Sequence, residues 1–213
     1  MALGTYQGLL DAIPAWLHRS GDADVIAAAP DFVTLAESGI YARLRTRYQE
    51  LNFAQVMQSG VISLPANYTD VKWAYIEGTP IQNLTRKSVD YILSQFPLRA
   101  GEARPRFFAR DGVSLIFGPS PDAAYEVKGV FYIAETPLSV SGSNGLFLRY
   151  PKLYLYGSLL QAEGFIRNDP TMNGMMQVWA ELYRVAIEEA QGDDDREAMS
   201  GGRARVSVAG VAP

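Results

Sequence analysis

The chain has 213 residues, of which 48% are hydrophobic and 20% are charged, and its formal net charge is −4. These proportions are those of an ordinary globular protein, so they exclude a chain that is disordered throughout. A mildly acidic protein lacks the basic surface that grips phosphates. We therefore expect no tight binding of nucleic acid, although DNA can pass such a surface without being held. The chain has no cysteine, which excludes disulfide bonds and thiolate chemistry.

The sequence contains no signal for membrane insertion or export. No apolar run approaches the roughly 20 residues that a membrane-spanning helix needs. The stretch MALGTYQGLLDAIP has neither the basic start nor the apolar core of a signal peptide. We therefore expect a protein that stays in the cytoplasm where it is made.

Two helices are expected in the N-terminal part of the chain. The first starts after Thr5, a suitable N-cap, and runs to about residue 17, with Pro14 predicted to kink or restart it. The glycine and aspartates of SGDAD are expected to end it. The second helix is predicted from a cap at Asp31 to about Phe53, because apolar residues recur there at helical spacing. Its predicted apolar face consists of Phe32, Leu35, Ala36, Ile40 and Leu44.

The middle of the chain is expected to be rich in β-strands. Three short strands are predicted between residues 59 and 85, where the apolar residues recur with a period of two. A short helix over about residues 86–96 follows, and we expect it to bury Val89, Ile92 and Leu93.

A hairpin and a long strand complete this middle region. The pair Asp111-Gly112 predicts a tight two-residue turn, because such turns need positive φ angles that glycine adopts readily. The strand predicted over residues 123–137 contains Gly129, which is typical of a β-bulge.

Two more helices are expected after the loop LSVSGSNG. Pro151 stands near the first position of one of them, where its missing N–H costs nothing. The predicted buried stripe of this helix consists of Leu153, Tyr156, Leu160, Gly164 and their neighbours. The last helix is predicted from about residue 171 to residue 189 and is expected to fade into an acidic stretch. Its predicted buried side chains are Met172, Met175, Met176, Trp179, Leu182, Tyr183 and Ala186.

The order of these elements predicts an α+β fold. We expect the N-terminal and C-terminal helix pairs to meet as a bundle that carries an inserted region of short antiparallel strands with a hairpin. The predicted parts are the N-terminal helices (1–58), the β-rich middle with one short helix (59–140), the C-terminal helices (141–198) and a flexible tail (199–213) that orders on partner binding.

No residue pattern in the chain indicates a catalytic, cofactor-binding or metal-binding site. The single histidine, His18, stands at the predicted end of the first helix, where a surface or capping role is expected. The acidic run of residues 193–195 is expected to be solvated, because consecutive side chains point in different directions. The cluster SGSNG lacks the Gly-Lys-Ser/Thr ending of a phosphate-binding loop. We expect no cofactor and no metal.

Four residues are candidates for contacts between subunits. Arg43 and Arg47 are expected either on a solvated surface or paired with acidic residues of a neighbouring subunit. Tyr154 and Tyr156 stand two positions apart on a predicted helix and cannot share a face. One is therefore expected to pack inside, and the other is free to meet a neighbour or to serve the subunit's own bundle.

Several segments together resemble the head-to-tail adaptor proteins of tailed bacteriophages, which are also called connector or head-completion proteins. They are TYQGLLDAIPAWLHR, DFVTLAESGIYARLRTR, SLPANYTD and NGLFLRYPKLYLYGSLLQAEGFIRND, in that order. The strongest is the LAE-x-x-I-x-x-x-L-R pattern from Leu35 to Arg45, and the likeness covers roughly residues 3–190. Pro14 inside the first helix departs from the expected pattern.

The resemblance implies a structural virion protein at the neck between head and tail. Such a protein forms a dodecameric ring, docks on the portal, completes the DNA channel and gives the tail a platform. It has no enzymatic activity and no cofactor, and it is assembled in the host cytoplasm. Its expected partners are other copies of itself, the portal and a downstream tail or nozzle protein.

The C-terminal tail is the candidate for the portal contact. It has lost the helical period and carries little charge, which is typical of a segment that folds on binding. Arg203 and Arg205 are expected to meet acidic residues of the portal, and Val206 and Val208 to pair as an added strand.

Two other functions are compatible with the sequence. The first is a joining protein on the tail side, such as a tail-completion factor or a tube terminator, which would bind the tail tube instead of the portal. The second is an enzyme that uses Glu126 and Glu135. These glutamates stand nine positions apart on one predicted strand, hence on opposite faces, and make a poor catalytic pair.

Overall fold

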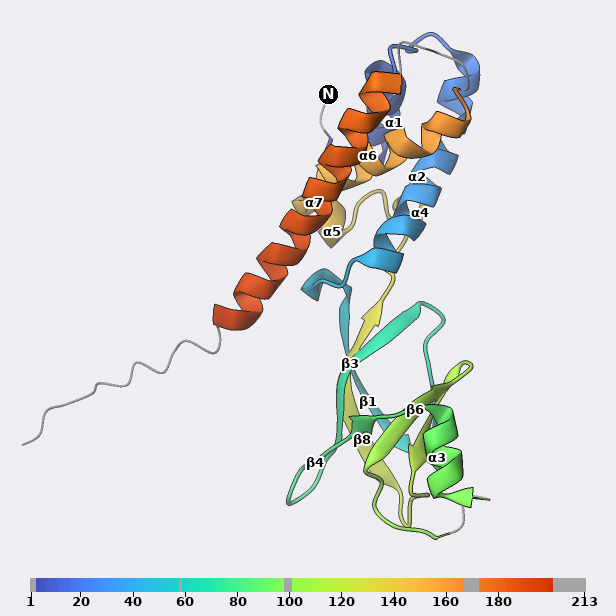
Figure 1. The fold of residues 1–213 in the computed structure, drawn as a ribbon, viewed down its shortest axis with the longest axis vertical. Helices are drawn as coiled ribbons and strands as arrows, with labels where there is room; N and C mark the ends of the chain where they lie inside the picture. The colour runs from blue at the N-terminus through green and yellow to red at the C-terminus, as the bar shows by residue number, and fades with distance from the viewer. Residues whose placement is uncertain (1–2, 58, 98–100, 167–172, 201–213) are drawn as a thin grey trace, which may run out of the picture. The chain divides into compact units, whose positions relative to one another are not determined.

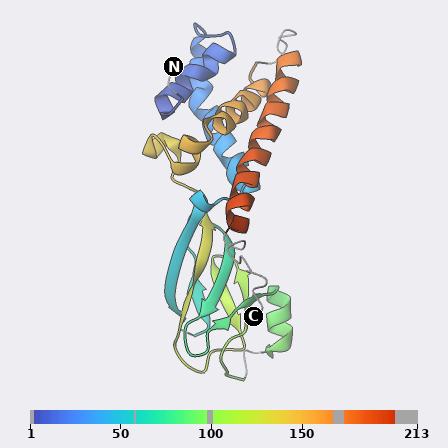
Figure 2. The same ribbon diagram turned by 90° about the vertical axis from the view of Figure 1, so that its left-hand side faces the viewer.

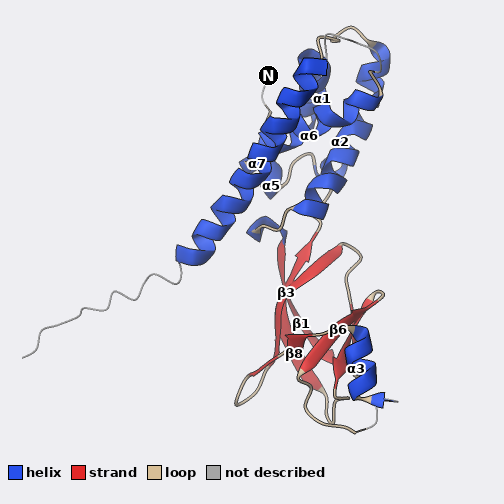
Figure 3. Ribbon diagram, in the orientation of Figure 1, coloured by secondary structure: helices blue, strands red, loops and turns tan. Residues whose placement is uncertain are grey.

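The structure is a computed structural model that describes residues 3–57, 59–97, 101–166 and 173–200. The chain divides into two compact units, one formed by residues 1–48 and 135–213 and the other by residues 49–134. The first, called the helical unit, is built from helices, and the second, called the β unit, carries the strands and one further helix (Figure 1; Figure 3). The predicted α+β class is confirmed, with the N-terminal and C-terminal helices in one unit and the strands inserted between them.

The first helix, α1, spans Tyr6–Trp16 and begins as predicted. The hydroxyl of Thr5 accepts a hydrogen bond from the N–H of Gly8, which satisfies one of the free donors of the first turn. Pro14 lies inside this helix, which continues past it and does not restart. The helix ends in a Schellman motif, in which His18 adopts a left-handed φ of 54° and the N–H of Arg19 donates to the carbonyl of Pro14.

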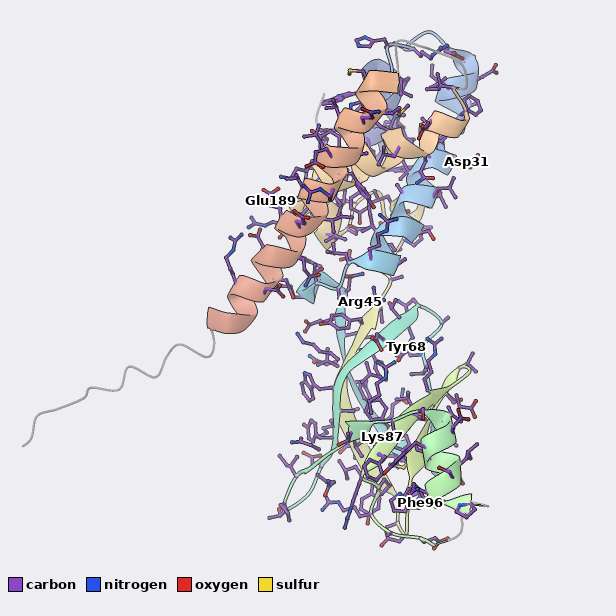
Figure 4. All side chains as sticks on the ribbon, viewed as in Figure 1. Asp31, Arg45, Tyr68, Lys87, Phe96 and Glu189 are labelled. Carbon is purple, nitrogen blue, oxygen red and sulfur yellow. The ribbon has the colours of Figure 1, made fainter. Side chains whose placement is uncertain are left out.

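The second helix, α2, spans Ala23–Arg43, so both of its predicted ends were wrong. Its N-cap is Asp22, whose carboxylate accepts hydrogen bonds from two N–H groups of the first turn. Pro30 lies inside the helix and does not precede it. The backbone becomes extended at Leu44, and Arg45 donates to carbonyls at this end of the helix (Figure 4).

Further short elements stand on either side of the β unit in the sequence. A 3-10 turn, η1, spans Arg47–Gln49 and follows α2. Two short helices, α4 (Leu138–Ser141) and α5 (Gly145–Arg149), occupy most of the segment predicted as a loop. They lead into α6 (Pro151–Gln161), which begins at proline as predicted, and a second 3-10 turn, η3 (Ala162–Gly164).

Helix α6 is the centre of the helical unit, because it packs against α1, α2 and α7 (Asn173–Ser200). A helix with neighbours on several sides buries more than one stripe. The predicted stripe was partly wrong, since Tyr156 and Leu160 are only half-buried and Gly164 is exposed outside the helix. The buried residues of α6 are Leu153, Tyr154, Leu155, Gly157, Ser158 and Leu159.

Helix α7 is longer than predicted, since it continues through the acidic stretch to Ser200. Its buried side chains include Met176, Trp179, Tyr183, Ala186 and Ala190. The prediction also placed Met175 and Leu182 in this buried stripe, but both are exposed, and Met172 lies outside the described residues.

The β unit contains two sheets, each of four strands. One sheet has the order β1-β8-β3-β4 and the other β2-β7-β6-β5. Strand β1 occupies residues that the prediction assigned to the end of a helix, and it pairs with β8 along its whole length. The bounds are β1 Glu50–Met57, β2 Val61–Ser63, β3 Tyr68–Ile76, β4 Gln82–Asn83, β5 Thr85–Arg86, β6 Phe107–Asp111, β7 Ser114–Gly118 and β8 Tyr125–Ile133.

The two sheets enclose one apolar core. Strands of both sheets contribute to it, with residues such as Val127 and Phe131 from one and Leu115 and Phe117 from the other. Helix α3 (Val89–Gln95) covers the other face of the second sheet, where Ile92 packs on alternate residues of β6 and β7. Leu93 was predicted to be buried beside Ile92 but is exposed.

The hairpin between β6 and β7 is confirmed, with its turn one residue later than predicted. Asp111 pairs with Ser114, so the two loop residues are Gly112 and Val113. Gly112 has a φ of 57°, whereas the φ of Val113 is not positive. A positive φ at the first loop position alone is typical of a type II′ turn.

Gly129 does not mark a bulge, because it pairs in regular register with Phe53 on one side and Ala74 on the other. The irregularities lie on β3, where Thr69 and Lys72 are each skipped in the pairing with β8. Gly129 is required for a different reason. A Cβ atom there would lie 2.3 Å from the carbonyl oxygen of Trp73.

Candidate functional site

The helical unit contains a groove between α2, α6 and α7 with a volume of about 460 Å³. Small residues on two helices, Ala36, Gly39 and Gly157, let the ring of Tyr183 approach closely. A Cβ on Gly157 would lie 3.2 Å from both the Cβ of Ala36 and the Tyr183 ring. Arg43, Gln161, Arg184 and Glu188 supply its polar lining. Apolar walls with a few polar groups are typical of a ligand-binding pocket.

The two candidate arginines have different surroundings. Arg43 is exposed at the groove, and its positive charge lowers the pKa of Tyr183, although burial of that tyrosine raises its pKa overall. Arg47 is partly used inside the subunit, because its Nε lies 3.3 Å from Oδ1 of Asp194 and its backbone N–H donates to the same oxygen at 2.9 Å. Arg43 is therefore the better placed of the two for a neighbouring molecule.

The two candidate tyrosines also differ from each other in burial. Tyr154 is completely buried and hydrogen-bonded inside the helical unit, so it cannot contact a neighbouring subunit. Tyr156 is half-buried and packs edge-on against Trp16, with ring centroids 6.0 Å apart. Trp16 is itself 40% exposed. This aromatic pair on α1 and α6 is accessible to a partner.

A buried network of side-chain hydrogen bonds surrounds Tyr154. Its hydroxyl lies 3.3 Å from that of Tyr41 on α2, and both hydroxyls interact with Asn144 at 3.2 Å. Asn144 also accepts the N–H of Phe147 and so caps α5. Burial, aided by nearby carboxylates, raises the pKa of Tyr41 to about 12, so the network is neutral at physiological pH. The network holds the segment that follows the β unit in the sequence against α2 and α6.

Two carboxyl groups fasten the same returning segment. Glu37 on α2 is 5% exposed, and its Oε1 accepts the N–H of Leu138 at 3.0 Å. Glu135 accepts the N–H of Gly145 at 3.0 Å. Burial raises the pKa of both carboxyls, and the backbone hydrogen bonds lower it in part.

Replacing Glu37 by glutamine is expected to change the pH dependence of stability. As pH rises above about 4.5, Glu37 loses its proton in the unfolded state first, because its pKa is higher in the folded state. The free energy of unfolding therefore falls as pH rises from about 4.5 through the raised folded-state pKa. Glutamine keeps the oxygen that accepts from Leu138 and removes the ionisation. Urea unfolding of Glu37→Gln and the parent chain should show a difference that increasingly favours the variant as pH rises from about 4.5 towards neutrality. A difference in the free energy of unfolding that does not change with pH would contradict this role. The control is Glu163→Gln, which removes one charge at an exposed position.

The acidic run of α7 is not simply solvated as predicted. Asp194 binds Arg47, and Asp193 accepts a hydrogen bond from the hydroxyl of Tyr150 at 3.0 Å and pairs with Arg196 at 3.1 Å. Asp195 is the exposed residue of the three, and it accepts a hydrogen bond from the side chain of Gln191 at 3.3 Å. The contacts of Asp194 with Arg47 and of Asp193 with Tyr150 join the C-terminal part of α7 to the residues before and after the β unit in the sequence. Sequence reasoning missed them because their partners are distant along the chain.

Exposed apolar side chains form a second stripe on α7, of which the sequence prediction assigned Met175 and Leu182 to the core. They are Met175, Val178, Leu182 and Val185, with 39, 53, 37 and 42% of their surface exposed. The signal that could have found them is that apolar residues occupy two adjacent stripes of this helix, more than one packing partner can bury.

A second exposed apolar surface lies on the β unit. Trp73 and Tyr75 stack on the face of β3 that points away from the core, with Ala54 and Lys128 beside them. Trp73 is 49% exposed. Neighbouring lysines are already paired with glutamates, as Lys128 is with Glu77, so this face is not strongly basic. It fits a protein partner better than a nucleic acid.

The residues that the sequence offered as possible catalytic groups lie apart from one another in the structure. Glu126 lies 3.5 Å from Lys128 in the β unit, whereas Glu135 caps a backbone N–H in the helical unit. His18 is exposed at the end of α1. Within the described residues, no three histidine or carboxylate side chains are grouped to hold a metal ion. In the same part of the chain, no helix is both long and apolar enough to cross a membrane.

The tail candidates Arg203, Arg205, Val206 and Val208 lie outside the described residues. Their expected contact with a portal therefore rests on the sequence.

Comparison with known proteins gives one family. No curated protein matches the sequence. The profile of the family described as SU10 adaptor protein matches residues 4–207, which is nearly the whole chain. The chain therefore belongs to the SU10 adaptor protein family, a family of phage head-to-tail adaptors.

Proposed function

We propose that this protein is the subunit of a ring, of twelve copies, that docks on the portal of a filled phage head, completes the DNA channel and presents a platform to a downstream tail or nozzle protein. The observation that carries the proposal is the family match over residues 4–207. The exposed apolar surfaces on both units support it, because large exposed apolar surfaces commonly mark sites of protein association.

The charge of the chain suits a channel for DNA. A formal net charge of −4 leaves no general attraction for phosphates, so the duplex passes without being held. The described residues offer no grouped metal ligands, and the buried carboxyls of Glu37 and Glu135 bind backbone N–H groups. The protein acts as a structural part of the virion neck, without catalysis, and assembles in the host cytoplasm.

The tail beyond Gly201 makes the portal contact, with Arg203 and Arg205 meeting acidic side chains and Val206 and Val208 adding a strand. Deleting the residues after Gly201 should leave the thermal melt unchanged and weaken binding to the purified portal at least about tenfold. Binding is measured by sedimentation with portal rings. Substituting Arg203 and Arg205 by glutamine in the full-length chain, which keeps the tail's length, should give a smaller loss. Normal docking by the truncated chain would remove the tail from the portal contact.

The alternative is a joining protein of the tail side, which would bind the tail tube. Pull-downs of the full-length chain with immobilised portal rings and with immobilised tail tubes from the same phage separate the two. Retention by the portal supports the adaptor. Retention by the tube alone assigns the protein to the tail side.

A further inference from the structure

Helix α7 carries two apolar stripes, and the described residues of the subunit cover one of them. The exposed stripe, Met175, Val178, Leu182 and Val185, follows the spacing of three, four and three residues with which helices pack against other helices. It extends over roughly 15 Å of a helix that rises 1.5 Å per residue. Beside it, Glu189 (labelled in Figure 4) pairs with Lys152 of α6, and Arg184 pairs with Glu181 and Glu188 of α7 itself. The stripe is therefore an apolar ridge flanked by charged side chains that have partners within the subunit.

A groove of about 340 Å³ lies between α1 and the start of α2. Its apolar lining is Leu10, Pro14, Ala15 and Ile26, and Ile26 is 49% exposed. At its polar edge, Asp11 accepts a hydrogen bond from Gln7 at 2.9 Å. Of the α1 residues in this lining, Leu10 and Ala15 are half-buried, and Pro14 is buried together with Leu9 and Ile13.

The ridge and the groove cannot meet within one chain. In Figure 2, α1 (dark blue) and α7 (orange to red) lie on opposite sides of the helical unit, with α6 and α2 packed between them. Because the two surfaces are different and separated, a contact between them joins the α7 of one copy to the α1 of another. Repetition of such a head-to-tail contact by a fixed rotation generates a closed ring.

We propose that the ridge of Met175, Val178, Leu182 and Val185 on one subunit packs into the groove of Leu10, Pro14, Ala15 and Ile26 on the next copy, and that this contact closes the ring. The inference rests on the proposed function, since it names the partner surfaces of the ring. The contact buries the apolar side chains of both surfaces, and Glu189 and Asp11 at their edges keep partners inside their own subunits.

Crosslinking tests the proposal directly, because the native chain has no cysteine. Val178→Cys and Ala15→Cys are made separately and together in the full-length chain, which is assembled on portal rings and treated with a short bismaleimide. The double variant should give a ladder of covalent oligomers, and each single variant should stay monomeric. Dimers from either single variant would mean that a surface pairs with itself. An assembly without a ladder would place the contact elsewhere and leave the adaptor function standing, whereas no assembly on the portal would overturn both.

A second measurement uses substitutions that do not enter the core. Leu182→Asp and Ile26→Asp, one on each surface, should weaken ring assembly at least about tenfold while the circular dichroism and thermal melt stay those of the parent chain. Leu35→Asp is the matched control, because Leu35 is 54% exposed on α2 and lies outside both surfaces. Parent-like assembly of Leu182→Asp would overturn the proposal.

Discussion

Replacing Gly129 by alanine is expected to destabilise the β unit by about 3 kcal/mol. The new Cβ would lie 2.3 Å from the carbonyl oxygen of Trp73 and 2.9 Å from the Cα of Ala74, so the backbone of β3 would have to move. It would also lie 2.8 Å from the ring of Phe53, which stacks on Phe131. Since β8 is paired on both sides, a shift of its neighbours disturbs the whole sheet.

Hydrogen exchange measured by mass spectrometry gives the readout for this variant. Peptides from β3 and β8 should exchange faster in Gly129→Ala, while peptides from α6, which belongs to the other unit, should keep their protection. Gly21→Ala is the control, because a Cβ at that position meets no atom within 4 Å. Equal protection of β8 in the parent chain and in Gly129→Ala would show that the strands are not as close at this point as described.

Trp179→Ala should cost about 3–5 kcal/mol, the range for removing a large aromatic side chain from a core. Trp179 is 1% exposed, and it lies in the buried stripe through which α7 packs on α6. Urea unfolding followed by circular dichroism measures the loss. Val178→Ala, one position earlier and 53% exposed, should change the free energy of unfolding by less than about 0.5 kcal/mol. Similar losses for the two variants would mean that the two stripes of α7 have been exchanged.

Helix starts could be predicted where the signal is local. Thr5 and Pro151 act within one turn of the chain, and both mark the starts that the structure has. The predicted start of α2 was wrong because two aspartates, Asp22 and Asp31, compete as caps, and the prediction placed the cap at Asp31, directly after Pro30. The structure uses Asp22, and the alanine-rich first turns carry the helix through Pro30. Where two capping signals of equal strength lie close together, the sequence alone does not show which of them starts the helix.

Elements that depend on distant partners could not be predicted. The stretch ELNFAQVM has no strict alternation, and β1 forms because β8 supplies a partner along its whole length. The extension of α7 to Ser200 is similar, since Asp193 and Asp194 find partners at Tyr150 and Arg47. Taken alone, Gly192 and the acidic residues 193–195 favour an end of the helix in this stretch.

The burial of the two candidate tyrosines was predictable in part. The spacing of Tyr154 and Tyr156 predicted that they face different ways, and the structure buries the first and leaves the second half-exposed. Which of the two is buried depends on the position of α2, whose Tyr41 meets Tyr154. The exposed stripe of α7 was missed because an apolar period predicts a packing surface without saying whether the partner belongs to the same chain.

The native mass of the full-length chain, measured by light scattering alone and then with purified portal rings, tests the adaptor assignment most directly. Each portal ring should then carry a stoichiometric ring of twelve copies of this chain. Leu182→Asp should fail to complete that ring. A chain that remains monomeric with its portal, and instead adds to the tail tube, would contradict the adaptor assignment.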